Sequence, residues 1–144
     1  YMKNRNITSI LIIISILNIF IFLCKKTKET FVTAIIAQTP KQIKLGLMFV
    51  KKALPNNHGM LFDYGISDNH KMWMKNTLIP LDIIFLGNEK EVLGFIENAK
   101  PLSMDLLGID EKSSFALEMN GGWVKKNNIE LGDIIDIRDI RKIT

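Results

Sequence analysis

The sequence predicts a mainly β protein: a compact antiparallel barrel or sandwich of about seven short strands with two short helices, preceded by an N-terminal hydrophobic helix. Beyond residue 30, apolar residues fall in runs of about five or six that are rich in β-branched and aromatic side chains, as in strands. Glycine, proline and asparagine separate these runs. No helical pattern after residue 30 is long enough to connect parallel strands, so we expect antiparallel pairing.

Residues 1–30 predict a signal or membrane-anchor segment. Lys3 and Arg5 precede an apolar stretch, residues 7–23, whose length is close to the lower limit of about 17 residues for a helix that spans a bilayer. Signal cleavage needs small residues near the end of such a stretch, and none is present. This pattern favours an uncleaved anchor over a removed signal.

Cys24 raises a third alternative, because bacterial lipoproteins are cut before a cysteine that follows an apolar stretch. Leu23 occupies the position where a small residue is expected, so lipidation is the less favoured interpretation. Lysines on the far side of the stretch compete with Lys3 and Arg5 under the positive-inside rule, which leaves the topology open. We expect an exported or membrane-anchored protein with its domain on the non-cytoplasmic side, in the periplasm or cell envelope.

Residues 31–144 are expected to form a single domain with two short helices. Thr39 is a typical N-cap and Pro40 suits a first helical position, so residues 39–49 predict the first helix. The second helical segment, residues 122–128, is polar and brief enough for only one or two turns.

Seven runs have the length and composition of strands. They are residues 31–37, 60–64, 70–74, 81–86, 91–97, 115–120 and a last strand within 129–137. Gly87 and Asn88 lie between two apolar runs and predict an antiparallel hairpin. Gly132 predicts a turn that Asp133 caps through backbone hydrogen bonds, and the polar residues 138–144 are expected to fray.

Charge and composition exclude several classes of protein. Residues 1–30 hold five of the 19 lysines and arginines and one of the 15 acids, which leaves 14 of each sign in the domain. A neutral domain lacks the basic character of a nucleic-acid binder. Cys24 is the sole cysteine, so an internal disulfide and a cysteine-rich zinc site are excluded. His58 and His70 lie in loop-like sequence, and we expect neither a metal nor a cofactor.

The stretch 81–86 contains an unusual buried acid. Alternation places Leu81, Ile83 and Phe85 on one face, and Asp82 with two apolar residues on the other. A carboxylate between two covered faces needs donors or a cation, because leaving it unpaired costs several kcal/mol. Lys75 is the nearest cation, and the bend at Pro80 could bring it to Asp82.

Two interpretations of this region remain open. Asn76, Pro80 and Asp82 are ordinary turn residues that could merely shape a corner. Alternatively, apolar walls and convergent polar groups form a ligand pocket. The candidate ligand-binding residues are Met60, Trp73, Met74, Lys75, Asn76, Asp82 and Asn120.

The segment 120–122 has two interpretations as well. Its backbone amides could bind an anion at the start of the following helix, or Gly121 and Gly122 could simply permit a tight turn. No nucleophile with a neighbouring base can be identified in the sequence, so catalytic residues are left unassigned. An enzyme would have to use Asp82 as general base and Lys75 as electrostatic stabiliser.

Several motifs together resemble a known family, the bacterial and archaeal domain of unknown function 192. The resemblance covers nearly all of residues 31–138, and the chain departs from the family pattern in the loop at 100–115. The matching motifs are "GLMF" at 46–49, "GMLF" at 59–62, "WMKNTLIPLDIIF" at 73–85, "ENAKPLS" at 97–103, "LEMNGGW" at 117–123 and "GD" at 132–133. The resemblance implies a compact mainly β fold, often behind an export signal, and brings no function with it.

We therefore expect an uncharacterised envelope domain that binds a small molecule or a partner protein near Trp73, Lys75, Asn76 and Asp82. The alternatives are a small enzyme of unknown reaction and a purely structural envelope protein. Membrane contact is expected through residues 7–23, a nucleic-acid partner is not expected, and the oligomeric state is open.

Overall fold

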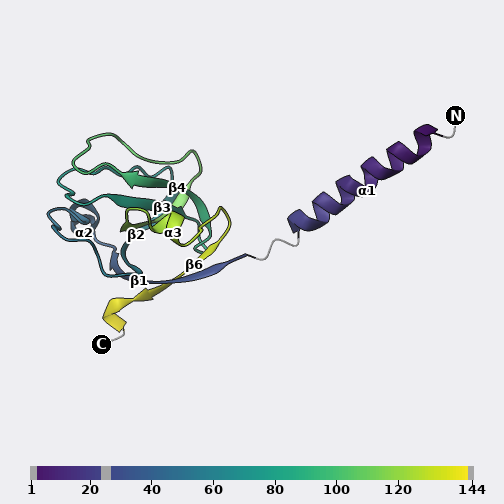
Figure 1. Cartoon of the computed structure of the whole chain (residues 1–144). Coiled ribbons are helices and arrows are strands. Elements are labelled where there is room, and N and C mark those ends of the chain that lie inside the picture. The colour runs from purple at the N-terminus through teal and green to yellow at the C-terminus, as the bar shows by residue number, and fades with distance from the viewer. Residues whose placement is uncertain (1–2, 24–26, 143–144) are drawn as a thin grey trace.

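The computed structural model describes residues 3–23 and 27–142 and confirms a mainly β fold with few short helices (Figure 1). Six strands are present where about seven were predicted. In chain order the elements are α1 (Lys3–Leu23), β1 (Glu29–Ala37), α2 (Pro40–Leu45), β2 (His58–Asp68), β3 (Leu81–Leu86), β4 (Val92–Ala99), β5 (Ser113–Asn120), α3 (Trp123–Lys126), β6 (Ile134–Asp139) and the 3₁₀ helix η1 (Ile140–Lys142).

The six strands form one sheet in the order β4-β3-β5-β2-β1-β6. The expectation of purely antiparallel pairing is wrong, because β1 runs parallel to both β2 and β6. Residues 38–57 make the crossover from β1 to β2 with only the short helix α2 and irregular backbone. The predicted hairpin is confirmed between β3 and β4.

The sheet curls into a half-barrel whose two edges meet at one end. Glu91 forms an antiparallel bridge with Ile134, and the Val92 N–H donates to the Asp133 carbonyl at 2.8 Å. One core cluster includes Val92 of edge strand β4 and Ile135 of edge strand β6, so it fills the inside of the curl. A second cluster, containing Phe62 and Phe85, covers the opposite face beneath α2 and the loops.

Segment 70–74 was predicted as a strand, and this prediction is wrong. Its only ladder contact is the bridge between Met72 and Leu107. Met72 and Met74 are nevertheless buried in the second core. The segment is apolar because its side chains are buried, although its backbone is coil. A short run of apolar residues does not by itself distinguish a buried coil from a strand.

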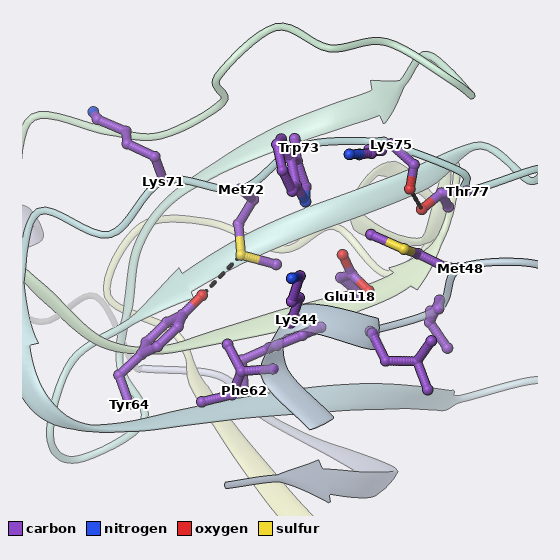
Figure 2. A pocket seen from close by; sticks show the side chains of 14 residues that line it. Lys44, Met48, Phe62, Tyr64, Lys71, Met72, Trp73, Lys75, Thr77 and Glu118 are labelled. Carbon is purple, nitrogen blue, oxygen red and sulfur yellow. Dashed lines mark hydrogen bonds between the residues drawn. The ribbon is translucent and has the colours of Figure 1, made fainter. Parts of the chain in front are cut away.

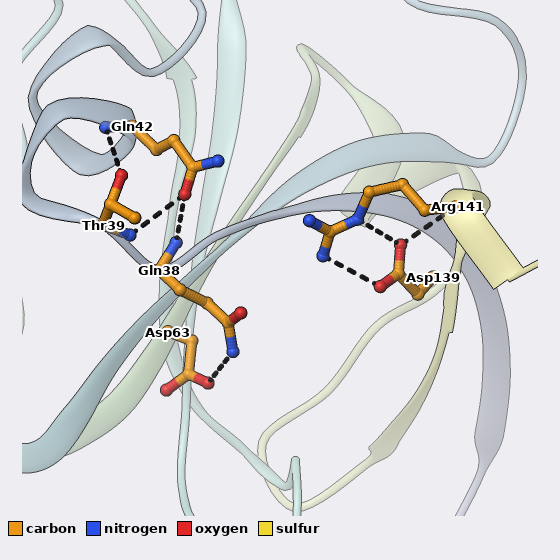
Figure 3. Close-up of polar contacts among 6 residues, drawn as sticks. All are labelled: Gln38, Thr39, Gln42, Asp63, Asp139 and Arg141. Atoms are coloured by element: carbon orange, nitrogen blue, oxygen red, sulfur yellow. Dashed lines mark hydrogen bonds and ion pairs between the residues drawn. The ribbon is translucent and has the colours of Figure 1, made fainter.

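Helix α2 begins as predicted but ends earlier. The Thr39 hydroxyl accepts the Gln42 N–H at 3.2 Å, and the Gln42 side chain accepts the Thr39 N–H at 3.0 Å, which completes a capping box (Figure 3). Gly46 then ends the helix with φ +48°. The expected fraying of residues 138–144 is wrong for the described part of that segment: Asp139 ends β6 and forms an ion pair with Arg141 at 2.9 Å (Figure 3).

Helix α1 lies away from the sheet in Figure 1, and its described side chains from Ile7 to Ile19 are exposed. Among the described residues, no helix combines the length and apolar character required to cross a membrane. Cys24, the alternative lipidation site, lies outside the described residues. Export and anchoring through residues 7–23 therefore remain predictions.

Asp82 joins three elements at one end of the half-barrel. Its side chain is fully buried, and one carboxylate oxygen accepts the backbone N–H groups of Asn98 at 2.8 Å and Gly122 at 3.0 Å. The other oxygen accepts the Val124 N–H at 2.8 Å. The carboxylate on β3 thereby holds the end of β4 and the start of α3.

Replacing Asp82 by asparagine should destabilise the fold. The amide of Asp82→Asn removes one acceptor and turns a donor toward a backbone N–H, so we expect the free energy of unfolding to fall by about 2–4 kcal/mol. Urea unfolding followed by tryptophan fluorescence measures this loss. Asp105→Asn, at an exposed loop position, is the matched control, and equal stabilities of the two variants would contradict the role of Asp82.

Candidate functional site

A groove lies between α2 with its following loop and the segment 69–79. One cavity of about 190 Å³ reaches down to strands β2 and β5 (Figure 2). A second cavity of about 370 Å³ continues outward over Phe49 and Asn76. The two cavities share Lys44, Leu45, Met48, Trp73 and Lys75 in their walls, so they form one continuous groove.

Glu118 lies at the base of this groove. It projects from the central strand β5 on the face of the second core, opposite Ile83 of β3 and Met60 of β2. Only 3% of the residue is exposed. Within the described chain, its Oε2 atom is buried without a hydrogen-bond partner. Figure 2 shows the carboxyl among the lining side chains.

Glycine allows the backbone to pass close to this carboxyl. A Cβ on Gly46 would lie 3.2 Å from Cζ of Phe62 and 3.9 Å from Oε2 of Glu118. Gly46 also has φ +48°, which disfavours other residues. The end of α2 therefore leaves space over the base of the groove that a larger residue would fill.

Burial controls the protonation of the acidic side chains at the bottom of the groove. Desolvation raises the pKa of Glu118 from 4.5 to about 8, so this carboxyl holds a proton at neutral pH. Burial, and secondarily the nearby Glu118 charge, raises the pKa of Tyr64 above its usual 10.0. The Tyr64 hydroxyl donates to the Met72 sulfur at 2.8 Å (Figure 2). Glu118 is thus an uncharged lining group whose proton is not donated to Tyr64 or Met72.

Cations and an aromatic ring border the groove. Lys75 Nζ lies 5.1 Å from the centre of the Trp73 ring, a cation–π distance, and Trp73 is 36% exposed. Lys44 comes from α2 and Lys71 from the opposite wall, whose Nζ donates to the Ile109 carbonyl at 3.3 Å. The groove therefore combines a protonated acid below with ammonium groups above.

Positive charge is concentrated around the groove although the domain is neutral. Three segments, 38–54, 69–79 and 100–107, lie side by side through backbone hydrogen bonds from Phe49 to Asn76 and from Leu102 to Thr77. We call them the groove loops. They carry seven of the domain's 14 basic residues and one of its 14 acids. Four of these lysines, Lys41, Lys44, Lys71 and Lys75, line the groove, where their positive charge attracts anions.

The structure places the seven predicted site residues in two groups. Trp73, Lys75 and Asn76 line the groove. The other four do not line it. Met74 is in the second core, and Met60 is half-buried against that core. Backbone amides enclose the Asp82 carboxylate, and the Asn120 side chain exchanges hydrogen bonds of 2.8 and 2.7 Å with the backbone of Leu54.

The predicted contact between Lys75 and Asp82 is wrong, since backbone amides occupy the carboxylate and Lys75 lies over Trp73. The amide-rich turn at 120–122 does bind an anion, but the anion is Asp82 of the same chain. Gly122 has φ +84°, so the tight-turn interpretation holds too. Asp133 caps its turn as expected, accepting the Glu130 N–H at 2.8 Å.

Neither histidine belongs to the groove lining. His70 stacks on Tyr64 with ring centres 3.7 Å apart, and His58 contacts the Asn56 carbonyl. Among residues 3–23 and 27–142, no group of three or more histidine, cysteine, aspartate or glutamate side chains could hold a metal ion.

Sequence reasoning missed Glu118. Alternation in 115–120 places it between Ala116 and Asn120 on one face of an otherwise apolar strand, the same signal that identified Asp82. The signal marks both acids as buried. It does not show which one has backbone donors nearby, because those donors come from residues distant in sequence.

The fold defines a small, mainly β domain with a groove on one face of its sheet. The chain belongs to the family DUF192, described as an "Uncharacterized ACR", whose model matches residues 22–137. The family resemblance seen in the sequence is thereby confirmed. No curated protein matches the chain at a significant level.

Two crystal structures are similar to this chain. One is a "putative transcription regulator" from Sinorhizobium meliloti 1021, with 38% identity, a TM-score of 0.67, and coverage of 70% of this chain and 78% of that one. The other is a protein of unknown function from Novosphingobium aromaticivorans DSM 12444, with 36% identity, a TM-score of 0.67, and coverage of 70% and 71%.

The raised pKa of Glu118 predicts how stability depends on pH. The folded state keeps the Glu118 proton up to about pH 8, whereas the unfolded chain releases it near 4.5. This group therefore makes stability fall as pH rises from about 4.5 to about 8. Glu118→Gln should remove that contribution, so its unfolding free energy relative to wild type should rise by on the order of 1 kcal/mol per pH unit between pH 5 and 8. Urea unfolding at each pH tests this, with the exposed Glu111→Gln as control; parallel pH profiles for wild type and Glu118→Gln would contradict it.

Proposed function

We propose that this chain is a non-catalytic binding domain that takes a small organic anion with an apolar body into the groove. One observation carries the proposal: a buried carboxyl oxygen of Glu118, which has no hydrogen-bond partner among the described residues, lies at the bottom of a groove whose upper walls carry lysines. Leaving a buried polar group unpaired costs about 1–3 kcal/mol, and such groups mark sites where another molecule supplies the partner.

The lining supports a ligand with two kinds of surface. Met48, Phe62 and Trp73 offer apolar and aromatic contacts, as in most small-molecule sites. Lys44 and Lys75 offer ion pairs at the upper walls, within a region of excess positive charge. A ligand that is apolar along its length and negatively charged at one group satisfies both.

Backbone strain supports a site at the same place. Phe49 is 61% exposed and has φ +66°, and Leu102 has φ +63°. Bulky residues rarely adopt this conformation, and such outliers gather at functional sites. Both residues belong to the groove loops, and Phe49 lines the outer cavity.

The hydrogen bonds of the hydroxyl groups in the groove lining favour binding over catalysis. The Thr77 hydroxyl points to the Lys75 carbonyl at 3.4 Å, and the Tyr64 hydroxyl is engaged by Met72. Neither is paired with a base that could activate it. Asp82, the general base of the enzyme hypothesis, is sealed beneath backbone amides.

The basic, apolar start of the sequence supports a location at the envelope. Residues 1–30 have the composition of an export or anchor segment. We propose that the domain meets its ligand on the non-cytoplasmic side of the membrane.

Binding can be tested with 8-anilinonaphthalene-1-sulfonate, an aromatic anion that fluoresces when it leaves water. We expect saturable binding to the native chain. Replacing both Lys44 and Lys75 by glutamine should weaken it about twofold to thirtyfold, because each exposed ion pair contributes roughly 0.2–1 kcal/mol. A fluorescence titration, with circular dichroism to verify folding, measures both quantities.

The matched control replaces Lys125 and Lys126 of α3 by glutamine, which makes the same change of charge outside the groove. Equal loss of affinity in the two double variants would show that the probe responds only to overall charge. No saturable binding at all would contradict the proposed function.

A nucleic acid is the second candidate, favoured by the excess positive charge of the groove loops and by the exposed rings of Trp73 and Phe49. The similar protein from Sinorhizobium meliloti, described as a transcription regulator, points the same way. Against it, the same loops expose the aliphatic side chains of Met104 and Leu106, which offer no stacking surface to bases.

Fluorescence anisotropy with a labelled oligothymidylate separates the two candidates. At physiological salt we expect only weak, non-specific affinity, with a Kd of about 10⁻⁴ M or higher. Submicromolar binding that disappears in the Lys44 and Lys75 double variant would mean that the groove binds a nucleic acid and not a small organic anion.

A further inference from the structure

We propose that the ligand is a carboxylic acid whose carboxylate shares one proton with the Glu118 carboxyl at the base of the groove. This inference rests on the proposed function and narrows the class of anion. Its geometric basis is the buried, unpartnered Oε2 atom beneath Gly46 and Phe62.

The charges around Glu118 decide between a cationic and an anionic ligand group. Tyr64 faces it from β2, Lys44 from α2, and Lys71 and Lys75 from the segment 69–79. The residue opposite it on β3 is the apolar Ile83. No second acid lines the described groove. An ammonium group would meet three lysines, whose like charge would repel it.

The ligand group that suits the bottom of the groove is therefore a hydrogen-bond acceptor. Glu118 is protonated at neutral pH, and its buried Oε2 atom has no hydrogen-bond partner in the part of the chain that the structure describes. A hydrogen bond from a carboxylic acid to a carboxylate is charge-assisted and roughly twice as strong as a neutral one. Two carboxyls that share one proton are a known arrangement in buried sites.

The number of oxygens favours a carboxylate over a sulfonate or phosphate. One carboxylate oxygen can meet the Glu118 proton while the other turns toward the lysines. A tetrahedral group carries a third oxygen, which would have to be buried against the apolar walls formed by Phe62 and Met72. A sulfonate is also a weaker hydrogen-bond acceptor, because its parent acid is much stronger.

Proton sharing makes binding depend on pH. Below about pH 8 the free site already holds its proton, and the complex forms with no net proton change. Above that value Glu118 is ionised in the free site, so binding must take up one proton from solution. The affinity for a carboxylate should then fall about tenfold for each further pH unit.

Benzoate, benzenesulfonate and benzylamine are matched probes, because they share the ring and differ in the charged group. In calorimetric titrations of the whole chain at pH 6.5, we expect benzoate to bind at least tenfold more tightly than either of the others. At pH 9.5 its advantage over benzenesulfonate should be lost. The wild-type pH profile requires no variant and so does not depend on how a variant folds.

Two variants test the role of Glu118 itself. Glu118→Gln keeps an N–H donor, so benzoate binding should persist with the pH dependence removed. Glu118→Leu keeps the bulk without a donor and should lose the preference for benzoate.

Equal affinities for benzoate and benzenesulfonate, tighter binding of benzylamine, or benzoate binding that is constant from pH 6.5 to 9.5 would overturn the carboxylate inference. If anilinonaphthalenesulfonate still binds in the groove, that outcome leaves the proposed function standing. If none of the four probes binds, both the inference and the proposed function fail.

Discussion

A carboxyl group inside a β-sheet must find a hydrogen-bond partner, and this requirement organises the whole domain. The neighbouring strands β3 and β5 each carry one buried carboxyl group, and the two groups lie on opposite faces of the sheet. Asp82 lies toward the inside of the curl and is satisfied by three backbone amides, which join β4 and α3 to β3. Glu118 lies on the other face, at the base of the groove, with an oxygen that has no partner in the described chain. The first acid holds β4 and α3 to β3, and the second is the group to which we propose that a ligand binds.

The local features of the fold were predictable from sequence because their causes are local. Strand β3 has the predicted bounds and alternation, and the Thr39 cap is formed by residues three positions apart. The parallel pairing of β1 with β6 was not predictable, since it joins residues about a hundred positions apart and the sequence between them contains no long helical pattern typical of a crossover. The coil at 70–74 was mistaken for a strand because burial alone makes it apolar.

The candidate site was predicted in part for the same reason. Trp73, Lys75 and Asn76 are adjacent in sequence, and they remain together on the groove wall. The partner assigned to Lys75 was wrong because the donors to Asp82 come from positions 98, 122 and 124. The neutral charge of the domain also concealed a separation of charge, which only the folded arrangement of the three groove loops makes visible.

The central claim is that Glu118 is a protonated acid in a pocket, held without an internal partner. Carbon-13 NMR of the side-chain carboxyl carbons measures this directly, with the Glu118 signal assigned by its absence in Glu118→Gln. We expect this signal to titrate near pH 8 in the ligand-free chain, well separated from the other glutamates. Titration near the ordinary glutamate value of 4.5 would contradict the claim, because it would mean that the carboxyl is ionised and stabilised at neutral pH.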